Sequence, residues 1–290
     1  TLWTKEIPKP YTKDGVQTSD GGYILIGYGG VFKLNSFGDI EWTSDIFCEP
    51  TSIEETADGG YIYTGTRGGA KMADEHTAII RLNSFGDTIW TTTVHRHNPN
   101  YHREGVGRDI DLLSDGNYII AGQSYLSDNS SGSNHGELIK INDFGDTLWT
   151  KRYLFQDYTR YNSVVENSFG NFVSVGSVYE NIGNSNCGSL IISETDNSGN
   201  LLWAKIYPGN VCGSQANSIE NTSDGGYIIC GTKRLMNNED ILWLLKTNNQ
   251  GDTLWTKTFG NPYGYGVAAK QLPNQGYIIL GIAWQNSFSA

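Results

Sequence analysis

Gly251-Asp252-Thr253-Leu254-Trp255-Thr256-Lys257 is a stretch that recurs along the chain, and its copies predict the fold. The other five copies are Thr1-Leu2-Trp3-Thr4-Lys5, Gly38-Asp39-Ile40-Glu41-Trp42-Thr43, Gly86-Asp87-Thr88-Ile89-Trp90-Thr91, Gly145-Asp146-Thr147-Leu148-Trp149-Thr150-Lys151 and Gly199-Asn200-Leu201-Leu202-Trp203-Ala204-Lys205. Six of the eight tryptophans lie in this motif. The chain is therefore an internal repeat, which predicts one domain over residues 1–290 because repeated units share a continuous core.

A second motif alternates with the first and predicts hairpins. Its copies are Asp20-Gly21-Gly22-Tyr23-Ile24, Asp58-Gly59-Gly60-Tyr61-Ile62, Asp115-Gly116-Asn117-Tyr118-Ile119, Gly170-Asn171-Phe172-Val173, Asp224-Gly225-Gly226-Tyr227-Ile228 and Gln275-Gly276-Tyr277-Ile278. Asp-Gly before a β-branched and aromatic run favours a type I′ turn, with positive φ at both central residues. Each unit is predicted to have four strands: one before this turn, one after it, a third after a loop, and a fourth that contains the tryptophan.

The spacing of these units indicates a β-propeller. The aromatic residue of the second motif recurs about every 40 to 57 residues, the period of propeller blades. No helical period of useful length is present. We expect an all-β, six-bladed propeller of four-stranded antiparallel blades, in which the strand Thr1–Lys5 closes the ring beside a candidate strand Ala283–Phe288. The alternative is an open solenoid, which leaves the terminal strands unpaired.

Composition argues against several classes of partner. The net charge is -11 and the pI about 4.8, which argues against nucleic acid, because phosphate binding needs clustered Lys and Arg. No run of 18 apolar residues predicts a membrane span. We expect no leader at the start of the chain and interpret it as a mature or excised part of a longer one.

The composite unit resembles a repeat of secreted bacterial and archaeal β-propeller proteins, often large multidomain surface proteins. The resemblance rests on Asp-Gly-Gly-Tyr-Ile-Ile-x-Gly followed by Leu-Ile-Lys-x-Asn-x-x-Gly-Asp-Thr-Leu-Trp-Thr-Lys and covers essentially the whole chain. The Asn-x-x-Gly-Asp-x-x-Trp part also resembles the tryptophan-docking motif of quinoprotein-type propellers, in which the tryptophan packs on the neighbouring blade. No set of quinone-binding residues is present. The motif is more distantly similar to the Asp box of sialidases, but there the Asp precedes the Gly, whereas here the Asp follows it. The resemblance implies an extracellular or cell-surface protein that is part of a larger multidomain chain. It implies the fold but no particular chemical activity.

The long connections are the predicted binding region, because variable loops on a rigid scaffold usually carry function. In a propeller blade both tight turns lie at one end, and the second-to-third-strand loops and the connections between blades lie at the other. The long segments all belong to this second end. They are residues 67–76, 94–107, 123–135, 153–161, 177–188 and 207–216. The alternative is that they are tolerated insertions.

The histidines of these segments are candidates for a divalent metal site. All five lie there: His76, His95, His97, His102 and His135. His95 and His97 lie on one side of an extended segment, and His102, or a nearby carboxylate, supplies a third ligand of the kind zinc prefers. The alternative is that these are ordinary polar-loop histidines and that no cofactor binds.

Aromatic and arginine side chains in the same segments suit a glycan, because sugar C–H faces stack on aromatic rings and hydroxyls need polar partners. The predicted ligand-binding residues are His95, His97, Tyr101, His102, Arg103, His135, Tyr158 and Tyr161, with Arg160 and Tyr179 beside them. The alternative is that the aromatics pack beneath their own loops.

Three carboxylates and four cysteines complete the candidates. Glu54, Asp111 and Glu220 occupy equivalent places on first strands and could bind a cation or act as a general acid and base, or be simply solvated. Cys187 and Cys212 are predicted to form a disulfide, which fits an oxidising compartment; Cys230 is expected in the core. The alternative is free thiols in a cytosolic protein.

Three functions follow as hypotheses. The first is a non-catalytic extracellular binding or adhesion module that presents its loop face to a glycan or a cell-surface protein. The second is a polysaccharide hydrolase or lyase that uses Glu54, Asp111 or His97; it is less favoured because no nucleophile motif is present. The third is a structural spacer within a larger surface protein.

Overall fold

The computed structural model describes residues 4, 6–7, 11–68, 76–94, 105–127, 132–182, 185–207, 213–236, 239–260 and 264–283, with the backbone alone at residues 127, 181–182 and 185–187. These residues form 22 β-strands, and no helix among them could cross a membrane. The chain divides into two compact units. Unit 1 comprises Thr1–Ser133 and Glu137–Arg152, and unit 2 comprises Asn134–Gly136 and Tyr153–Ala290.

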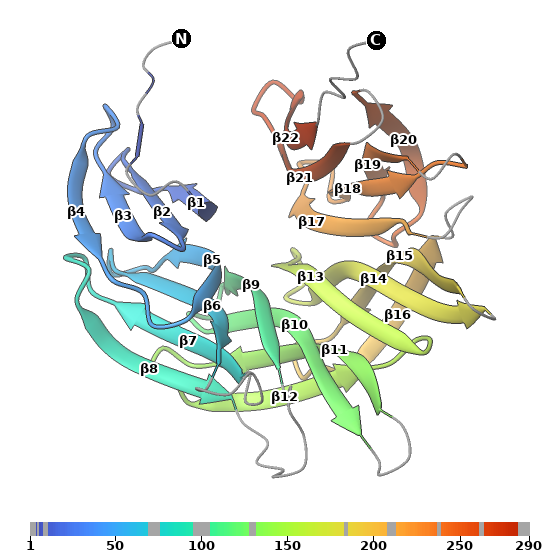
Figure 1. The fold of residues 1–290 in the computed structure, drawn as a ribbon, viewed down its shortest axis with the longest axis horizontal. Coiled ribbons are helices and arrows are strands. Elements are labelled where there is room, and N and C mark those ends of the chain that lie inside the picture. Colours follow the sequence, from blue (N-terminus) through green and yellow to red (C-terminus); the bar gives the residue numbers. More distant parts are fainter. Residues whose placement is uncertain are drawn as a thin grey trace, which may run out of the picture. The chain divides into compact units, whose positions relative to one another are not determined.

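Unit 1 contains three four-stranded sheets, each an antiparallel meander (Figure 1). The first sheet contains β1 (Thr12–Gln17), β2 (Tyr23–Gly27), β3 (Gly30–Leu34) and β4 (Ile40–Ser44). The second contains β5 (Glu49–Glu55), β6 (Tyr61–Arg67), β7 (His76–Leu82) and β8 (Thr88–Val94). The third contains β9 (Val106–Leu112), β10 (Tyr118–Ser127), β11 (Gly132–Ile141) and β12 (Thr147–Tyr153).

The described residues of unit 2 form two further four-stranded meanders and a two-stranded sheet. Its first sheet contains β13 (Tyr158–Glu166), β14 (Phe172–Ile182), β15 (Ser185–Thr195) and β16 (Leu201–Tyr207). Its second contains β17 (Gln215–Asn221), β18 (Tyr227–Arg234), β19 (Asp240–Thr247) and β20 (Thr253–Phe259). The last contains β21 (Gly264–Gln271) and β22 (Tyr277–Ala283).

The prediction of six four-stranded blades is wrong, because five sheets have four strands and the sixth has two among the described residues. The strands expected to complete the sixth sheet and close a ring are not seen: Ala283 ends β22, and most of Thr1–Lys5 and of Ala283–Phe288 lies outside the described residues. With no further described strand beside it, β22 has Ile278 and Leu280 59% and 61% exposed, whereas the equivalent Ile228 and Cys230 of β18 are buried. A strand motif repeats locally, but a complete blade also needs pairing partners from other parts of the chain.

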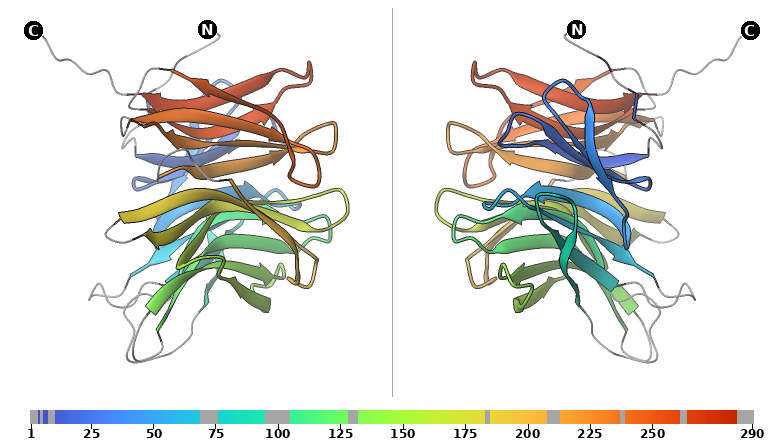
Figure 2. Two further views of the ribbon diagram at one scale, coloured as in Figure 1. Left: turned by 90° about the vertical axis from the view of Figure 1, so that its right-hand side faces the viewer. Right: turned by 90° about the vertical axis from the view of Figure 1, so that its left-hand side faces the viewer.

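The turns also differ from the predicted type I′ geometry. In the β1–β2 turn the Gly21 amide donates to the Thr18 carbonyl and the Thr18 amide to the Gly22 carbonyl. Gly21 has a φ of 82°, and Asp20 before it does not have positive φ. This is a type I turn closed by one left-handed glycine, the usual three-residue hairpin loop. In each four-stranded meander the turn between the first and second strands and the turn between the third and fourth strands lie at the same end of the sheet, as predicted (Figure 2).

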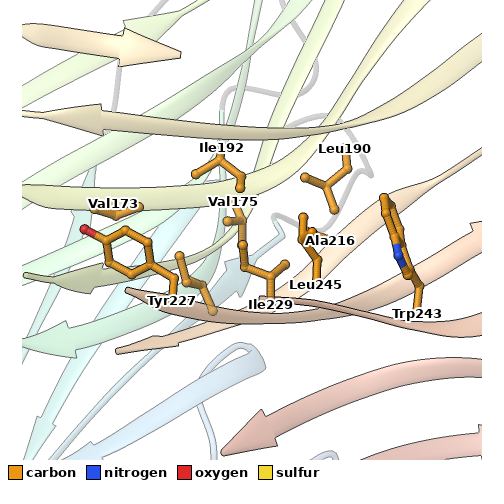
Figure 3. Close-up of a cluster of buried hydrophobic side chains, with 10 residues drawn as sticks. Val173, Val175, Leu190, Ile192, Ala216, Tyr227, Ile229, Trp243 and Leu245 are labelled. Atoms are coloured by element: carbon orange, nitrogen blue, oxygen red, sulfur yellow. The ribbon is translucent and has the colours of Figure 1, made fainter. Parts of the chain in front are cut away.

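Apolar side chains pack neighbouring sheets together within each unit. In unit 1, Ile24 and Ile26 of β2 join Ile53 of β5 and Tyr63 of β6 in one buried cluster. In unit 2, Val173 and Val175 of β14 face Tyr227 and Ile229 of β18, with Leu190, Ile192 and Trp243 extending the cluster (Figure 3). Because alternate residues of a strand point to opposite faces, Tyr61 and Tyr63 of β6 pack in the unit 1 cluster, whereas Ile62 between them packs in another with Ile110 and Ile120 of the third sheet.

The tryptophan of the repeat contacts the next sheet in unit 1. Trp42 of β4 donates from Nε1 to the Ser84 carbonyl at 3.1 Å, and Trp90 of β8 donates to the Asp143 carbonyl at 3.1 Å. The ring of Trp42 lies against Gly86, where a Cβ atom would be 2.7 Å from it. The glycine and the tryptophan of the motif are therefore coupled, because only a residue without a side chain leaves room for the ring.

Buried cations hold the first turn of most sheets. Lys33 Nζ lies 2.8 Å from Asp20, Lys140 Nζ 2.8 Å from Asp115, and Lys246 Nζ 3.0 Å from Asp224. Arg81 makes the equivalent ion pair with Asp58. Among the described four-stranded sheets the exception is β13–β16, in which Glu194 replaces the cation.

Candidate functional site

Most of the predicted histidine site has no described geometry. His95, His97, Tyr101, His102 and Arg103 all lie outside the described residues. His135 lies half-buried on β11. Among the residues that the structure places, no group of three or more His, Cys, Asp or Glu side chains could hold a metal ion. The metal hypothesis on His95, His97 and His102 therefore stays a prediction.

Two of the predicted loops are mostly strand. Residues 123–127 and 132–135 belong to β10 and β11, and residues 177–182 and 185–188 to β14 and β15. The ladder between β14 and β15 runs from Phe172 opposite Thr195 to Ile182 opposite Ser185. The β-prone sequence Ser177-Val178-Tyr179 continues β14 into the segment where the long spacing between motifs predicts a loop.

Tyr161 lies in the core rather than on the predicted binding face. Its side chain is 0% exposed. Its hydroxyl is 2.6 Å from the Ser193 hydroxyl, and its ring lies 5.8 Å from that of Tyr153, centroid to centroid. Burial raises the pKa of Tyr161 far above its ordinary value. A ligand could reach this ring only if the sheet opened.

Tyr158, by contrast, lies at the edge of the extended hairpin. It is half-buried and pairs across the ladder with Tyr179 of β14. The two ring centroids are 5.0 Å apart and the planes meet at 88°. In such an edge-to-face pair the positive edge of one ring lies against the negative face of the other, and this attraction holds both rings in place.

Two glycines connect this tyrosine pair to an ion pair on the next sheet. The Gly213 amide donates to the Gly188 carbonyl at 3.0 Å. A Cβ atom on Gly188 would lie 2.9 Å from the Tyr179 ring, and one on Gly213 would lie 3.1 Å from Arg234. Side chains at these two positions would therefore push the tyrosine and the arginine away.

Arg234 and Asp240 form a bidentate pair across the β18–β19 hairpin. Arg234 donates from Nε at 2.7 Å and from Nη2 at 2.8 Å to the two carboxylate oxygens of Asp240. The side chains are 37% and 33% exposed. The carboxylate raises the pKa of Arg234, so the guanidinium stays charged at all working pH values. We call the set Tyr158, Tyr179, Gly188, Gly213, Arg234 and Asp240 the Tyr–Arg surface.

The position of the Arg234–Asp240 pair in the sheet shows which feature of the sequence could have predicted it. The two residues lie opposite each other at the ends of β18 and β19. Opposite charges six residues apart across a predicted hairpin loop are a visible signal, but residues 234–240 are not among the long segments predicted to bind. The glycines carried no such signal, because their role depends on contacts between separate sheets.

The three predicted carboxylates all lie on first strands. Glu54 lies on β5 and Asp111 on β9 in unit 1, and Glu220 lies on β17 in unit 2. Burial raises the pKa of Glu220, and the opposing effect of the Lys270 charge is smaller. The structure therefore favours the protonated form of Glu220 more than water does.

The cysteines are described only in part. Cys48 and Cys230 are free thiols, and Cys230 is buried in the core as predicted. Burial raises the pKa of each to about 12, so neither is a reactive thiolate. Cys212 and the side chain of Cys187 lie outside the described part, and the backbone of Cys187 belongs to β15 rather than to a loop.

Comparison with solved structures identifies several similar folds. A protein of unknown function from Bacteroides caccae aligns with a TM-score of 0.57 and 14% identity, over 89% of this chain and 85% of that one. A luciferin-regenerating enzyme aligns with a TM-score of 0.54 and 10% identity, over 90% and 80%. A gluconolactonase from Xanthomonas campestris aligns with a TM-score of 0.53 and 10% identity, over 93% and 83%.

No family model matches the chain, and no curated protein matches its sequence. At these identities the structural similarity shows the fold alone, an all-β propeller with five four-stranded blades. The chemistry of the neighbours is not carried over with it.

Proposed function

We propose that the protein is a non-catalytic carbohydrate-binding module of the extracellular space or cell surface, and that the Tyr–Arg surface contacts the sugar. The observation that supports this most is the Tyr158–Tyr179 pair beside the Arg234–Asp240 ion pair, on two adjacent sheets of unit 2. Both aromatic rings and the guanidinium are partly exposed.

The chemistry of this surface matches that of a pyranose. The apolar C–H face of the ring can stack on a tyrosine, and the hydroxyls need both donors and acceptors. Arg234 uses Nε and Nη2 for Asp240, which leaves the Nη1 amino group directed to other partners. The carboxylate of Asp240 keeps lone pairs for a hydroxyl, and the ion pair holds both groups in position.

The first experiment is a glycan array with the purified protein, run with and without a chelator. We expect binding of a restricted set of glycans that survives the chelator. Binding that the chelator abolishes would instead favour the predicted histidine metal site. If no glycan binds, the carbohydrate proposal is wrong, and a protein partner or a spacer role takes its place.

Variants then locate the binding surface. Tyr179→Ala and Arg234→Gln are each expected to weaken binding roughly tenfold, because one stacking or charge-assisted contact contributes about 1.5 kcal/mol. The matched control is Tyr28→Ala in unit 1, where Tyr28 forms a similar pair with Tyr11 at 6.4 Å. Equal loss in the control would indicate a general effect on folding and contradict the assignment.

A second candidate function is hydrolysis of a lactone or a polysaccharide, and Glu220 is the observation that favours it. A carboxyl group with a raised pKa can act as a general acid near neutral pH. Similar solved structures include gluconolactonases. Turnover of gluconolactone or a polysaccharide that disappears in Glu220→Gln would support this function. Turnover that persists in Glu220→Gln would exclude this residue.

A further inference from the structure

Three exposed phenylalanines lie at equivalent positions in unit 1, at the end of the sheets opposite the long connections. Phe37, Phe85 and Phe144 each occupy the tip of the turn between the third and fourth strands of a sheet. Their side chains are 70%, 78% and 81% exposed. Exposed large apolar side chains that recur at one place mark an interaction surface more often than isolated ones do.

Hydrogen bonds hold these tips in a fixed conformation. In the β7–β8 turn, Asn83 Oδ1 accepts the Phe85 amide at 2.9 Å and the Asp87 amide at 2.9 Å. In the turns at Phe37 and Phe144, Oδ1 of Asn35 and of Asn142 accepts the same pair of backbone amide bonds. Each ring is therefore presented on a rigid support rather than on a mobile loop.

The turn itself does not need a phenylalanine. In unit 2 the equivalent tips are Ser198 and Gln250, and their amides donate to Asp196 Oδ1 at 2.9 Å and to Asn248 Oδ1 at 3.0 Å. The same turn thus forms with a polar residue at its tip. The phenyl rings of unit 1 contribute neither to the turn bonds nor to the core, so the fold does not account for them.

The charge around the rings is negative. The turns of unit 1, residues 17–22, 34–41, 55–61, 82–89, 112–118 and 141–148, contain no Lys or Arg, and they contain Asp20, Asp39, Glu41, Glu55, Asp58, Asp87, Asp115, Asp143 and Asp146. The cations that neutralise the first turns, Lys33, Arg81 and Lys140, are only 2% to 4% exposed. Asp87 and Asp146 accept hydrogen bonds from the uncharged side-chain amides of Asn83 and Asn142.

We propose that this end of unit 1 is a docking surface for a basic segment of another protein. We call it the Phe–Asp surface: Phe37, Phe85 and Phe144 with Asp39, Asp87 and Asp146. Guanidinium and ammonium groups are attracted to the faces of phenyl rings. They also pair with carboxylates, and this surface offers both within each turn. Charge complementarity therefore selects an arginine- or lysine-rich partner over an acidic or neutral one.

The test titrates the whole protein with a labelled peptide of six Arg-Gly repeats, with six Lys-Gly and six Glu-Gly repeats for comparison. We expect the arginine peptide to bind more tightly than the lysine peptide, because arginine stacks on aromatic rings in addition to pairing with carboxylates. Binding should weaken as salt is raised. The glutamate peptide should not bind. Absence of arginine-peptide binding at low salt would overturn the proposal.

The decisive variant is Phe37→Ser/Phe85→Ser/Phe144→Ser, which copies the serine tip already present at Ser198. We expect about tenfold weaker arginine-peptide binding, because three exposed cation–π contacts are lost, with an unchanged melting temperature. The matched control is Phe169→Ser, which removes a 73% exposed turn phenylalanine from unit 2 and should leave binding unchanged.

Three outcomes contradict the proposal. Undiminished binding in the triple variant would mean that the peptide is attracted by net charge alone. An equal loss in Phe169→Ser would place the partner elsewhere. Binding of neutral phosphatidylcholine vesicles that the triple variant abolishes, without peptide binding, would identify a lipid surface rather than a protein as the partner.

Discussion

Glu194 shows how single residues in this repeat depend on one another. The other four-stranded sheets place Lys or Arg at its position and Asp on the first turn. In the sheet β13–β16 the turn residue is Phe169, and Glu194 accepts hydrogen bonds from Asn167 at 3.1 Å, Asn171 at 2.6 Å and Trp203 at 2.7 Å. Loss of the turn carboxylate thus accompanies loss of the cation. A buried charge is stable only with its partners.

This dependence predicts the effect of Glu194→Lys. The change should lower the free energy of unfolding by about 3 kcal/mol, because it leaves a buried cation without a carboxylate. Adding Phe169→Asp should recover more than half of the loss, since the new carboxylate would stand at the turn position from which Asp115 binds Lys140. Urea unfolding of both single variants and the double variant measures the coupling. Strictly additive effects would contradict it.

Gln275 gives a second prediction at the scale of a residue. It is the only described residue other than glycine with positive φ, 63°, and the equivalent turns have glycine there. Gln275→Gly should stabilise the β21–β22 hairpin by about 0.5–1 kcal/mol, because the left-handed conformation strains a residue with a Cβ atom. The melting temperature measures it. Gly225→Gln is the reverse control and should destabilise.

At the scale of elements, the long hairpins decide where the candidate surface lies. β14 and β15 each span 11 residues, whereas β2 and β3 each span 5. The extension carries Tyr179 beyond the blade and brings Gly188 against Gly213, which precedes β17. Strand length, and not loop composition, therefore places the Tyr–Arg surface.

The disulfide between Cys187 and Cys212 stays a prediction, because Cys212 and the side chain of Cys187 lie outside the described residues. Each cysteine directly precedes one of two glycines joined by a backbone hydrogen bond of 3.0 Å. We expect non-reducing peptide mapping by mass spectrometry to detect a Cys187–Cys212 peptide and to find Cys230, which is buried in the core, alkylated only after unfolding. Rapid labelling of Cys212 in the native protein would contradict this pairing.

At the scale of the whole molecule, the repeated turn carboxylates make stability depend on acid. Hydrogen bonds from Lys33 and Thr18 to Asp20, from Thr56 and Arg81 to Asp58, and from Thr222 and Lys246 to Asp224 lower each pKa to about 2. The ordinary value is 3.8. Since the folded-state pKa is the lower one, this stabilisation is present above about pH 4 and is lost as the pH falls towards about 2.

We therefore expect the melting temperature to fall between about pH 4 and about pH 2 in both units. Asp224→Asn should lower the melting temperature at neutral pH, because Lys246 loses its carboxylate, and should make the loss in acid shallower. A scan of melting temperature against pH checks both. An unchanged slope in the variant would mean that other carboxylates control the acid response.

The sequence by itself determined the order of the strands, the positions of the hairpin turns and the four-stranded unit of five sheets, because these depend on residues close together along the chain; it did not determine the turn type or the full length of β10, β11, β14 and β15. It also indicated, through the resemblance of the motif, that tryptophan contacts the next sheet, as Trp42 and Trp90 do. Only the tertiary structure decided the rest. Tyr158 and Tyr161 look alike in sequence, but alternate strand faces and the neighbouring sheet bury Tyr161 and leave Tyr158 partly exposed.

Gly188, Gly213 and Arg234 likewise meet from separate parts of the chain. This contact has no counterpart in any short stretch of the sequence. Burial and pairing depend on distant segments, which local sequence does not encode.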